Sequence, residues 1–532
     1  MQSMNGVNIG ETLVSPNACS NVIKHVANEM QQEMVRYVVD GKKLFSIMID
    51  ESTTIANSQA MIIYLRTEFE DEVCTFFLGL IPVVQPSATD LKRELCNFLH
   101  VIGLTDAVLA EQLIGFCSDG ASTMVGCYND VATLLKEQYP KIQTFHCMTH
   151  RLELAVRKSA STVNAVTHFQ IFVDSLYKFY SMSPKNEREL QEIASKTHAT
   201  LLKIGKIFEV RWAFSTFQSL KALLNDYAPL YANFSGICRM GSRSGDVTSK
   251  CRGLMLKMSK WIFVAQLCML KDALRILKHL SLYFQSNNAS LINAGTKVEQ
   301  AKAQLLAMKQ LPGKSLKKFL ASTEATQSFR GVVLIKTDAE CHQFESVKRQ
   351  FYQSLVDNLV ERFPCTEILK AAKVLEPAEW PSDELERTLF GSGEVTKLCK
   401  LLTIPSEIAI DVLSDFSTYK ASMKIGHFLR TLIRKVSIYP ISSADCERGF
   451  SVMNRQHTGD RNRLHPDTVS SLLTVAINGP PVELWDSKRY VLKWLRSGRH
   501  GSDDKLTGKA RKEPVELTRH RLFTRKSSSG VL

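Results

Sequence analysis

The chain has 532 residues, which is too long for one ordinary domain and predicts about three domains, or one domain with a large insertion. Its composition, 44% hydrophobic and 23% charged, excludes a collagen, a coiled-coil rod and a wholly disordered protein, and it contains no apolar run long enough to span a membrane. The net charge of +14 favours a polyanionic partner, most simply nucleic acid.

The N-terminal part changes from a helical pattern to a strand pattern. Residues 1–40 are expected to form a helical lead-in, because apolar residues recur every three or four positions. Short apolar runs follow at 44–50, 60–69 and 73–83, the last two separated by an acidic turn. Such runs predict a β-meander of three strands.

Helices and strands alternate after the meander. An amphipathic helix is expected at 88–103, a strand at 113–120, a helix at 121–139 and a strand at 142–147, directly followed by another helix. This order predicts an α/β fold with a mixed five-stranded sheet and flanking helices, in which the first strand lies beside the fourth. We assign residues 41–164 to this first part of the core.

The strand signal is lost between residues 165 and 430. Leucine and phenylalanine recur there at helical spacing, notably at 267–280 and 344–363, which predicts a large all-helical insertion. Residues 431–495 are expected to return to the core. The segment 496–532 is rich in Lys, Arg, Gly and Ser and predicts a disordered basic tail, either simply solvated or used for phosphate binding or nuclear import.

The cysteine usage bears on the cellular compartment. Thirteen cysteines are scattered along the chain without a CxxC pair. The N-terminus has neither the basic nor the apolar part of a secretion signal. Both features predict a reduced protein of the cytosol or nucleus.

Two acidic residues follow buried strands in the predicted sheet. Asp50 ends the run FSIMID, and Asp119 follows GFCS. The carboxyl ends of central strands are where α/β folds place ligands, and converging carboxylates could bind Mg²⁺ or Mn²⁺ while leaving positions for phosphate oxygens. The alternative is structural, because DEST and SDG are also ordinary cap and turn sequences.

Two further motifs allow both a functional and a structural interpretation. In FHCMTHR, Cys147 and His150 have half of a zinc-ligand spacing, but no second half follows, so we predict packing or supporting roles and no structural zinc. In VRW, Arg211 and Trp212 could grip a phosphate and stack on a base, or merely dock a helix.

The densest cluster lies at 441–477. Glu447 is next to Arg448, more arginines follow, and then an apolar helical face. An acid among arginines suits a phosphate-handling site, and the apolar face suits self-association. The structural alternative is a surface ion-pair network followed by an ordinary core helix.

Taken in order, these motifs resemble those of the hAT (hobo/Ac/Tam3) transposases and of host proteins derived from them. The resemblance covers about residues 40–480 and rests on FSIMIDEST, GFCSDGAS, HCMTHRLEL, VRW and SS-x-x-x-ER-x-FS. It implies an RNase H-like core interrupted by a helical insertion. It also implies that Asp50, Asp119 and Glu447 form an acid triad that binds Mg²⁺ or Mn²⁺.

The resemblance implies roles for the other motifs as well. Cys147 and His150 would help to shape the active site. Arg211 and Trp212 would contact the DNA end. Arg448, next to Glu447, is the further phosphate contact that the arginine-rich cluster itself suggests. The block 441–477 would belong to the C-terminal dimerisation region, so that the chain forms a homodimer or a higher oligomer.

The sequence departs from the family in one respect. Family transposases carry a zinc-binding BED-type domain upstream of the core, and this sequence has no such Cys/His pattern, so we expect a fragment, a truncated isoform or a domesticated descendant. The favoured prediction is a nuclear, dimerising, hAT-derived protein that cleaves and joins DNA if its triad is active. The alternatives are a non-catalytic nuclear interaction protein and, because some vertebrate relatives are associated with SUMO transfer, a SUMO-pathway ligase or adaptor.

Overall fold

The computed structural model describes residues 16–53, 58–85, 87–119, 130–205, 212–240, 243–461 and 463–496. Within these ranges the chain forms two compact units. Unit 1 is built from 1–147, 290–292 and 374–532, and unit 2 from 148–289 and 293–373. Of the predicted basic tail 496–532, Arg496 is the last residue of a helix, and residues 497–532 lie outside the described residues.

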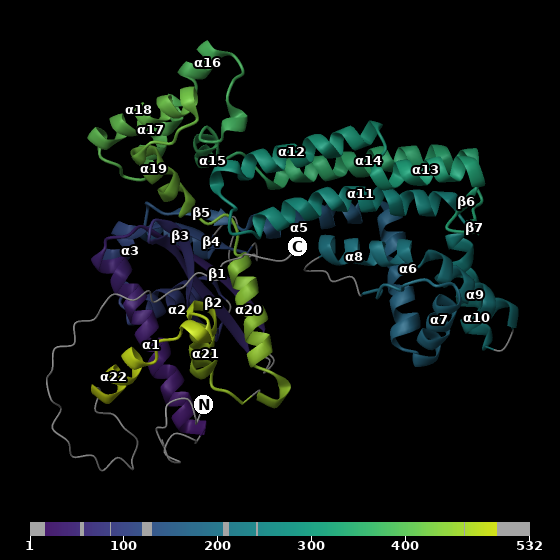
Figure 1. The fold of residues 1–532 in the computed structure, drawn as a ribbon, viewed down its shortest axis with the longest axis horizontal. Coiled ribbons are helices and arrows are strands. Elements are labelled where there is room, and N and C mark those ends of the chain that lie inside the picture. The colour runs from purple at the N-terminus through teal and green to yellow at the C-terminus, as the bar shows by residue number, and fades with distance from the viewer. Residues whose placement is uncertain are drawn as a thin grey trace. The chain divides into compact units, whose positions relative to one another are not determined.

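Unit 1 contains a mixed five-stranded sheet (Figure 1). Its strands are β1 (Phe45–Thr53), β2 (Gln59–Phe69), β3 (Glu72–Pro82), β4 (Leu113–Ser118) and β5 (Gln143–His146). The strand order is β3-β2-β1-β4-β5, in which β1, β4 and β5 are parallel and the β1–β2 and β2–β3 pairs are antiparallel. The predicted α/β sheet, with the first strand beside the fourth, is therefore confirmed.

One face of the sheet is covered by helices from the N-terminal part of the chain. These are α1 (Pro16–Asp40), α2 (Ala88–Val101), α3 (Asp106–Gln112) and α4 (Val131–Gln138). Their apolar residues form a core with alternate strand residues such as Ile47 and Ile49 of β1, as expected from the period of two in a strand.

Two boundaries differ from the sequence expectation. The helix expected at 88–103 ends at Val101, because Gly103 has a left-handed φ of +104° and its N–H bonds the carbonyl of His100. The short helix α3 follows at once and was not predicted, since seven residues show little periodicity. Of the helix expected at 121–139, residues 121–129 lie outside the described residues, and the described part is α4.

The opposite face of the sheet is covered by elements from the C-terminal part of the chain. These are α20 (Ala444–Gln456) and α21 (Pro466–Asn478), whose residues Cys446, Phe450, Met453, Val469 and Leu473 pack on the sheet core. The short helix α22 (Lys488–Arg496) lies along α1, where Arg489 pairs with Glu33 and Lys493 with Glu29. Further elements of this part of unit 1 are α16 (Glu384–Leu389), α17 (Ser392–Leu401), α18 (Ser406–Ser422), α19 (His427–Ser437) and the short 3-10 turn η2 (Gly459–Arg461).

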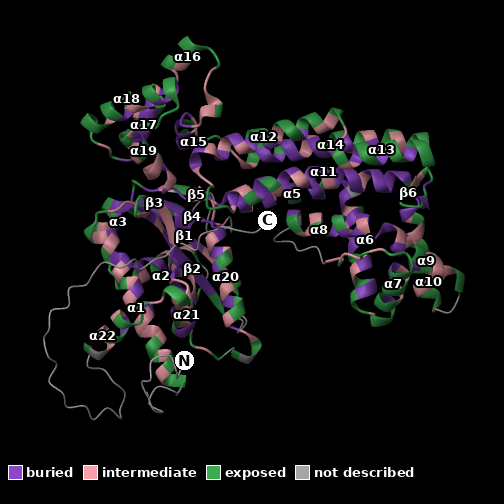
Figure 2. Cartoon of the chain, viewed as in Figure 1, coloured by how far each residue is buried: buried purple, intermediate pink, exposed green. Residues whose placement is uncertain are grey.

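Unit 2 is mainly helical. Its helices are α5 (Met148–Ser161), α6 (Asn164–Ser181), α7 (Pro184–Lys196), α8 (Trp212–Asn225), α9 (Tyr227–Met240), α10 (Gly245–Met258), α11 (Trp261–Phe284), α12 (Leu291–Gln310), α13 (Lys314–Thr326), α14 (Asp338–Arg362) and α15 (Glu367–Lys373). Helix α11 is buried along most of its length (Figure 2), which explains its nearly continuous apolar sequence. A small hairpin of β6 (Ser328–Phe329) and β7 (Val332–Val333) was not expected in the helical segment.

Across the described ranges, no helix combines the length and apolarity needed to cross a membrane.

Candidate functional site

The register of the parallel strands places Asp50 level with Asp119. Met48 of β1 pairs with Cys117 of β4, and each acid follows its paired residue by two positions. Strand β1 extends beyond this pairing, because its antiparallel partner β2 supports it as far as Thr53. Both carboxylates therefore belong to the carboxyl edge of the parallel strands, where ligand sites of α/β sheets are found.

Glu447 reaches the same edge from the first turn of α20, a helix that packs on β1 and β2. The close approach of this helix depends on Gly449. A Cβ atom at Gly449 would lie 2.4 Å from Ile62 Cδ1 and 2.5 Å from Tyr64 Oη, so with any larger residue either these two side chains or α20 would have to move. The helix thus brings an acid from the far end of the sequence next to Asp50.

The electrostatics show that these acids are near neighbours. Burial, and after it the negative charges of Asp119 and Glu447, together raise the pKa of Asp50 to about 8, against a hydrogen bond of 2.9 Å from the Glu51 N–H to Asp50 Oδ1. Burial and the charge of Asp119 also raise the pKa of Glu51 to about 7. Glu51 is therefore a fourth acid of the site, which the sequence analysis missed although it is adjacent to Asp50.

Cys147 joins the strand ends to the segment that precedes α20. Its N–H donates to the Ser118 carbonyl at 2.9 Å, and its buried Sγ accepts a hydrogen bond from the Ser443 N–H at 3.3 Å. Ser442 Oγ lies 3.5 Å from the same sulfur. These contacts fix the entry of α20 beside β4 and β5, and only Ser442 of the SS-x-x-x-ER motif makes its contact with Cys147 through the hydroxyl group.

The remaining residues singled out from the sequence are distributed as follows. Arg448 lies on α20 next to Glu447, is about half exposed and pairs with Asp445. His150 lies on α5 of unit 2 and is partly buried. Arg211 is outside the described residues, and Trp212 begins α8 in unit 2. Of the predicted DNA-contacting residues, Arg448 is thus in unit 1 with the acids, and its described contact is with Asp445.

A buried glutamate of unit 2 supports the helix that begins at Trp212. Glu153 of α5 is 7% exposed, and its Oε2 accepts a hydrogen bond of 3.0 Å from the Ala213 N–H. A carboxylate at this position stabilises a helix N-terminus, because the first N–H groups of a helix have no partner within it. Glu153 of the HRLEL motif therefore contacts Ala213, which directly follows the VRW motif, although the two residues are 60 positions apart in the sequence.

The donor chemistry at the acid site suits a hard divalent cation. All four acids offer oxygen atoms, the ligands preferred by Mg²⁺ and Mn²⁺, and Glu51 Oε1 is buried without a hydrogen-bond partner in the described part of the chain. Among the described residues, however, no three acidic, histidine or cysteine side chains are already arranged as a coordination group. The residues fit such an ion by chemistry and location, and their side chains would close around it.

Two family models match the chain. One, described as the ZMYM1/FAM200, RNase-like domain, matches residues 5–130, which include β1 to β4 and both Asp50 and Asp119. The other, described as the hAT family C-terminal dimerisation region, matches residues 400–477, which include Glu447. The chain is an hAT-derived protein. The predicted RNase-like core and the dimerisation region of this hAT-derived chain are both confirmed.

The structure assigns part of the apolar helix in this region to the core: Leu473 is buried, whereas Leu472, Val475, Ala476 and Ile477 stay partly exposed. Helix α21 packs on β3 and α1 within unit 1, and Val469 and Leu473 are fully covered. Ser470 Oγ accepts a hydrogen bond of 3.0 Å from the Leu80 N–H, and Asn478 bonds the Phe77 backbone at 3.0 and 2.8 Å, so α21 also covers the edge strand β3. The buried face of α21 is therefore an ordinary core face.

Proposed function

We propose that unit 1 of this hAT-derived protein binds Mg²⁺ or Mn²⁺ and cleaves DNA phosphodiester bonds. The observation that supports this proposal is the meeting of Asp50, Asp119 and Glu447, which come from β1, the end of β4 and α20. A bound divalent cation would activate water and stabilise charge on the phosphate. Asp50 and Asp119 would hold it from the sheet, Glu447 from the helix, and Cys147 would keep the helix start in place.

Contacts with DNA would come from cationic and aromatic side chains. Arg448, half exposed beside Glu447, is well placed to bind a phosphate of a strand that reaches the acids. We propose that Arg211 and Trp212 contribute a phosphate contact and a stacking surface, as the family resemblance implies. The net charge of +14 would strengthen binding to DNA at low salt and is in keeping with a nuclear location.

Self-association would use surfaces of the dimerisation region other than the buried face of α21. Exposed apolar side chains in this region include Ile410 of α18 and Met423, which are 69% and 60% exposed. We propose that these side chains contribute to the contact with a second copy. An Ile410→Glu, Met423→Glu double variant would then be monomeric by sedimentation velocity under conditions in which the wild type is not.

The experiment that tests the catalytic proposal compares the wild type with Asp119→Asn and Glu447→Gln. Each protein receives labelled candidate terminal-repeat DNA, a plasmid target and Mn²⁺, and both nicking and joining are measured. Cleavage by the wild type that falls at least about 100-fold in both variants would support a triad acting on the phosphodiester. Equal cleavage by all three proteins would point to a contaminating nuclease and contradict the proposal.

A second candidate function rests on the match to the dimerisation region, which needs no catalysis. On this alternative the chain is a non-catalytic nuclear interaction protein that keeps the fold and the dimerisation region. Its prediction is that Asp119→Asn leaves self-association and partner binding unchanged and that isothermal calorimetry detects no Mn²⁺ binding. Site-specific Mn²⁺ binding by the wild type that Asp119→Asn abolishes would count against it.

A further inference from the structure

A cavity separate from the acid site lies in unit 1, between α20, α21 and the adjoining ends of β2 and β3. Its volume is about 170 Å³, and most of its wall is apolar. Leu80, Ile81 and Pro82 line it from β3, and Met453, Leu464 and Val469 line it from the C-terminal segment. None of the four acids of the candidate site lines it.

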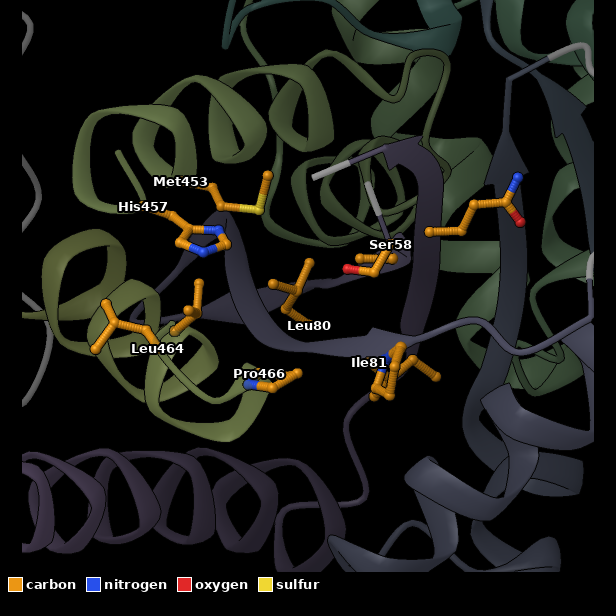
Figure 3. Close-up of a pocket in the computed structure, with 11 residues that line it drawn as sticks. Ser58, Leu80, Ile81, Met453, His457, Leu464 and Pro466 are labelled. Atoms are coloured by element: carbon orange, nitrogen blue, oxygen red, sulfur yellow. The ribbon is translucent and has the colours of Figure 1, made fainter. Parts of the chain in front are cut away.

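His457 is a polar residue of this cavity, and its ring nitrogens have no hydrogen-bond partner among the described residues. The residue follows α20, lines the cavity and is only 5% exposed. Figure 3 shows its imidazole beside Met453 on one side of the pocket, with Ser58 and Ile81 on the other. Neither Nδ1 nor Nε2 makes a hydrogen bond to any group in the described part of the chain.

Leaving both ring nitrogens unsatisfied is costly. A buried polar group without a partner costs about 1–3 kcal/mol, whereas a bound molecule with a hydroxyl group would satisfy one nitrogen. Water is a poor substitute in such a place, because a buried water needs about two to four polar partners and the wall is mainly hydrocarbon and thioether. We therefore expect a ligand of this cavity to be mostly apolar and to carry one polar group.

The volume of the cavity limits the size of the ligand that it can hold. An apolar protein cavity of about 150 Å³ is known to hold benzene, so this one has room for one six-membered ring with a small substituent. Met453 offers a thioether, which makes favourable contacts with aromatic rings. We propose that this cavity is a binding site for a small phenol, whose ring fills the apolar part and whose hydroxyl group hydrogen-bonds His457.

The proposal is independent of catalysis by the acid site. It is tested on the full chain with the matched probes 4-fluorophenol and 4-fluorotoluene, whose binding is followed by ¹⁹F NMR titration. The phenol is expected to bind about fivefold more tightly or better, which corresponds to one net hydrogen bond of about 1 kcal/mol. His457→Leu should abolish or reverse this preference while the ring still binds.

The second part of the experiment fills the cavity with a larger side chain. Val469→Phe, or Leu464→Phe at a less buried position if the first variant does not fold, should abolish binding of both probes while circular dichroism stays unchanged. The proposal is overturned if neither probe binds the wild type, if both bind equally well, or if binding survives in a folded cavity-filling variant.

Discussion

Asp50 within β1 and Asp119 directly after β4 lie level with each other, each two residues beyond the pair formed by Met48 and Cys117. Asp50 is held by its pairing with Ile62 of β2, and Asp119 follows the last residue of the strand beside β1, so the sheet keeps the two charges close together. The charge of Asp119 consequently raises the pKa of Asp50, after the larger effect of burial. This enforced proximity has consequences for stability as well as for ligand binding.

Asp50→Asn is expected to stabilise the metal-free protein at alkaline pH. The pKa of Asp50 is raised from 3.8 to about 8 in the folded chain, so the folded state binds a proton more tightly than the unfolded state. The free energy of unfolding therefore falls as the pH rises from about 4 to about 8. At pH 8 the variant should gain about 2 kcal/mol, less than the full shift implies because Asp50 is only partly buried.

The measurement is urea unfolding at pH 5 and pH 8 in the presence of a chelator. The gain should shrink toward zero at pH 5, and Asp411→Asn on the exposed side of α18 should change little at either pH. Added Mn²⁺ should stabilise the wild type more than Asp50→Asn. A gain that is the same at both pH values would show that charge crowding is not its cause.

Gly449→Ala is expected to destabilise unit 1 even though alanine favours a helix. The new Cβ would lie 2.4 Å from Ile62 Cδ1, so the buried Ile62 side chain must leave its position or α20 must shift, at a cost of about 1–3 kcal/mol. Gly236→Ala in α9 is the matched control, because nothing lies within 4 Å of a Cβ there, and it should gain up to about 1 kcal/mol. Thermal unfolding of both variants tests this contrast, and equal effects would contradict it.

Cys147→Ala is expected to loosen the start of α20. It removes the sulfur that accepts the Ser443 N–H and leaves that buried amide without its partner, at a cost of about 1–2 kcal/mol. Cys147→Ser retains an acceptor and should be milder. Cys96→Ala, a buried cysteine on the other face of the sheet, is the control. Hydrogen exchange at the Ser443 amide should accelerate in Cys147→Ala and stay unchanged in the control; acceleration in both would indicate general destabilisation.

The sheet and its two acids could be predicted from the sequence because both depend on local patterns. Continuous apolar runs marked β1 and β4, and the rule that parallel strands share a carboxyl edge brought Asp50 and Asp119 together before their register was known. Glu447 was different: its place depends on the close packing of α20, which in turn depends on Gly449, a mid-helix glycine with no local explanation in the sequence. Glu447 was assigned to the site from the family resemblance, because hydrophobic periodicity does not indicate where α20 packs.

Other features stayed hidden for similar reasons. The apolar side of α21 could have faced a partner or the core, and only the edge strand β3, about four hundred residues earlier, shows which of its residues are covered. No motif singled out Glu153, yet it is buried against α8. In each case the missing information is a tertiary contact between segments that are far apart in the sequence.

Glu153→Gln is expected to weaken the N-terminal turn of α8. The substitution keeps an acceptor for the Ala213 N–H but removes the negative charge that favours a helix N-terminus, so the loss should be about 0.5–2 kcal/mol, and Glu153→Ala should cost more. Exposed Glu187→Gln on α7 serves as the control. Hydrogen exchange at the Ala213 amide gives the local readout: faster exchange in Glu153→Gln with unchanged global unfolding would show that the carboxylate stabilises this turn, whereas unchanged exchange would mean that its charge is irrelevant there.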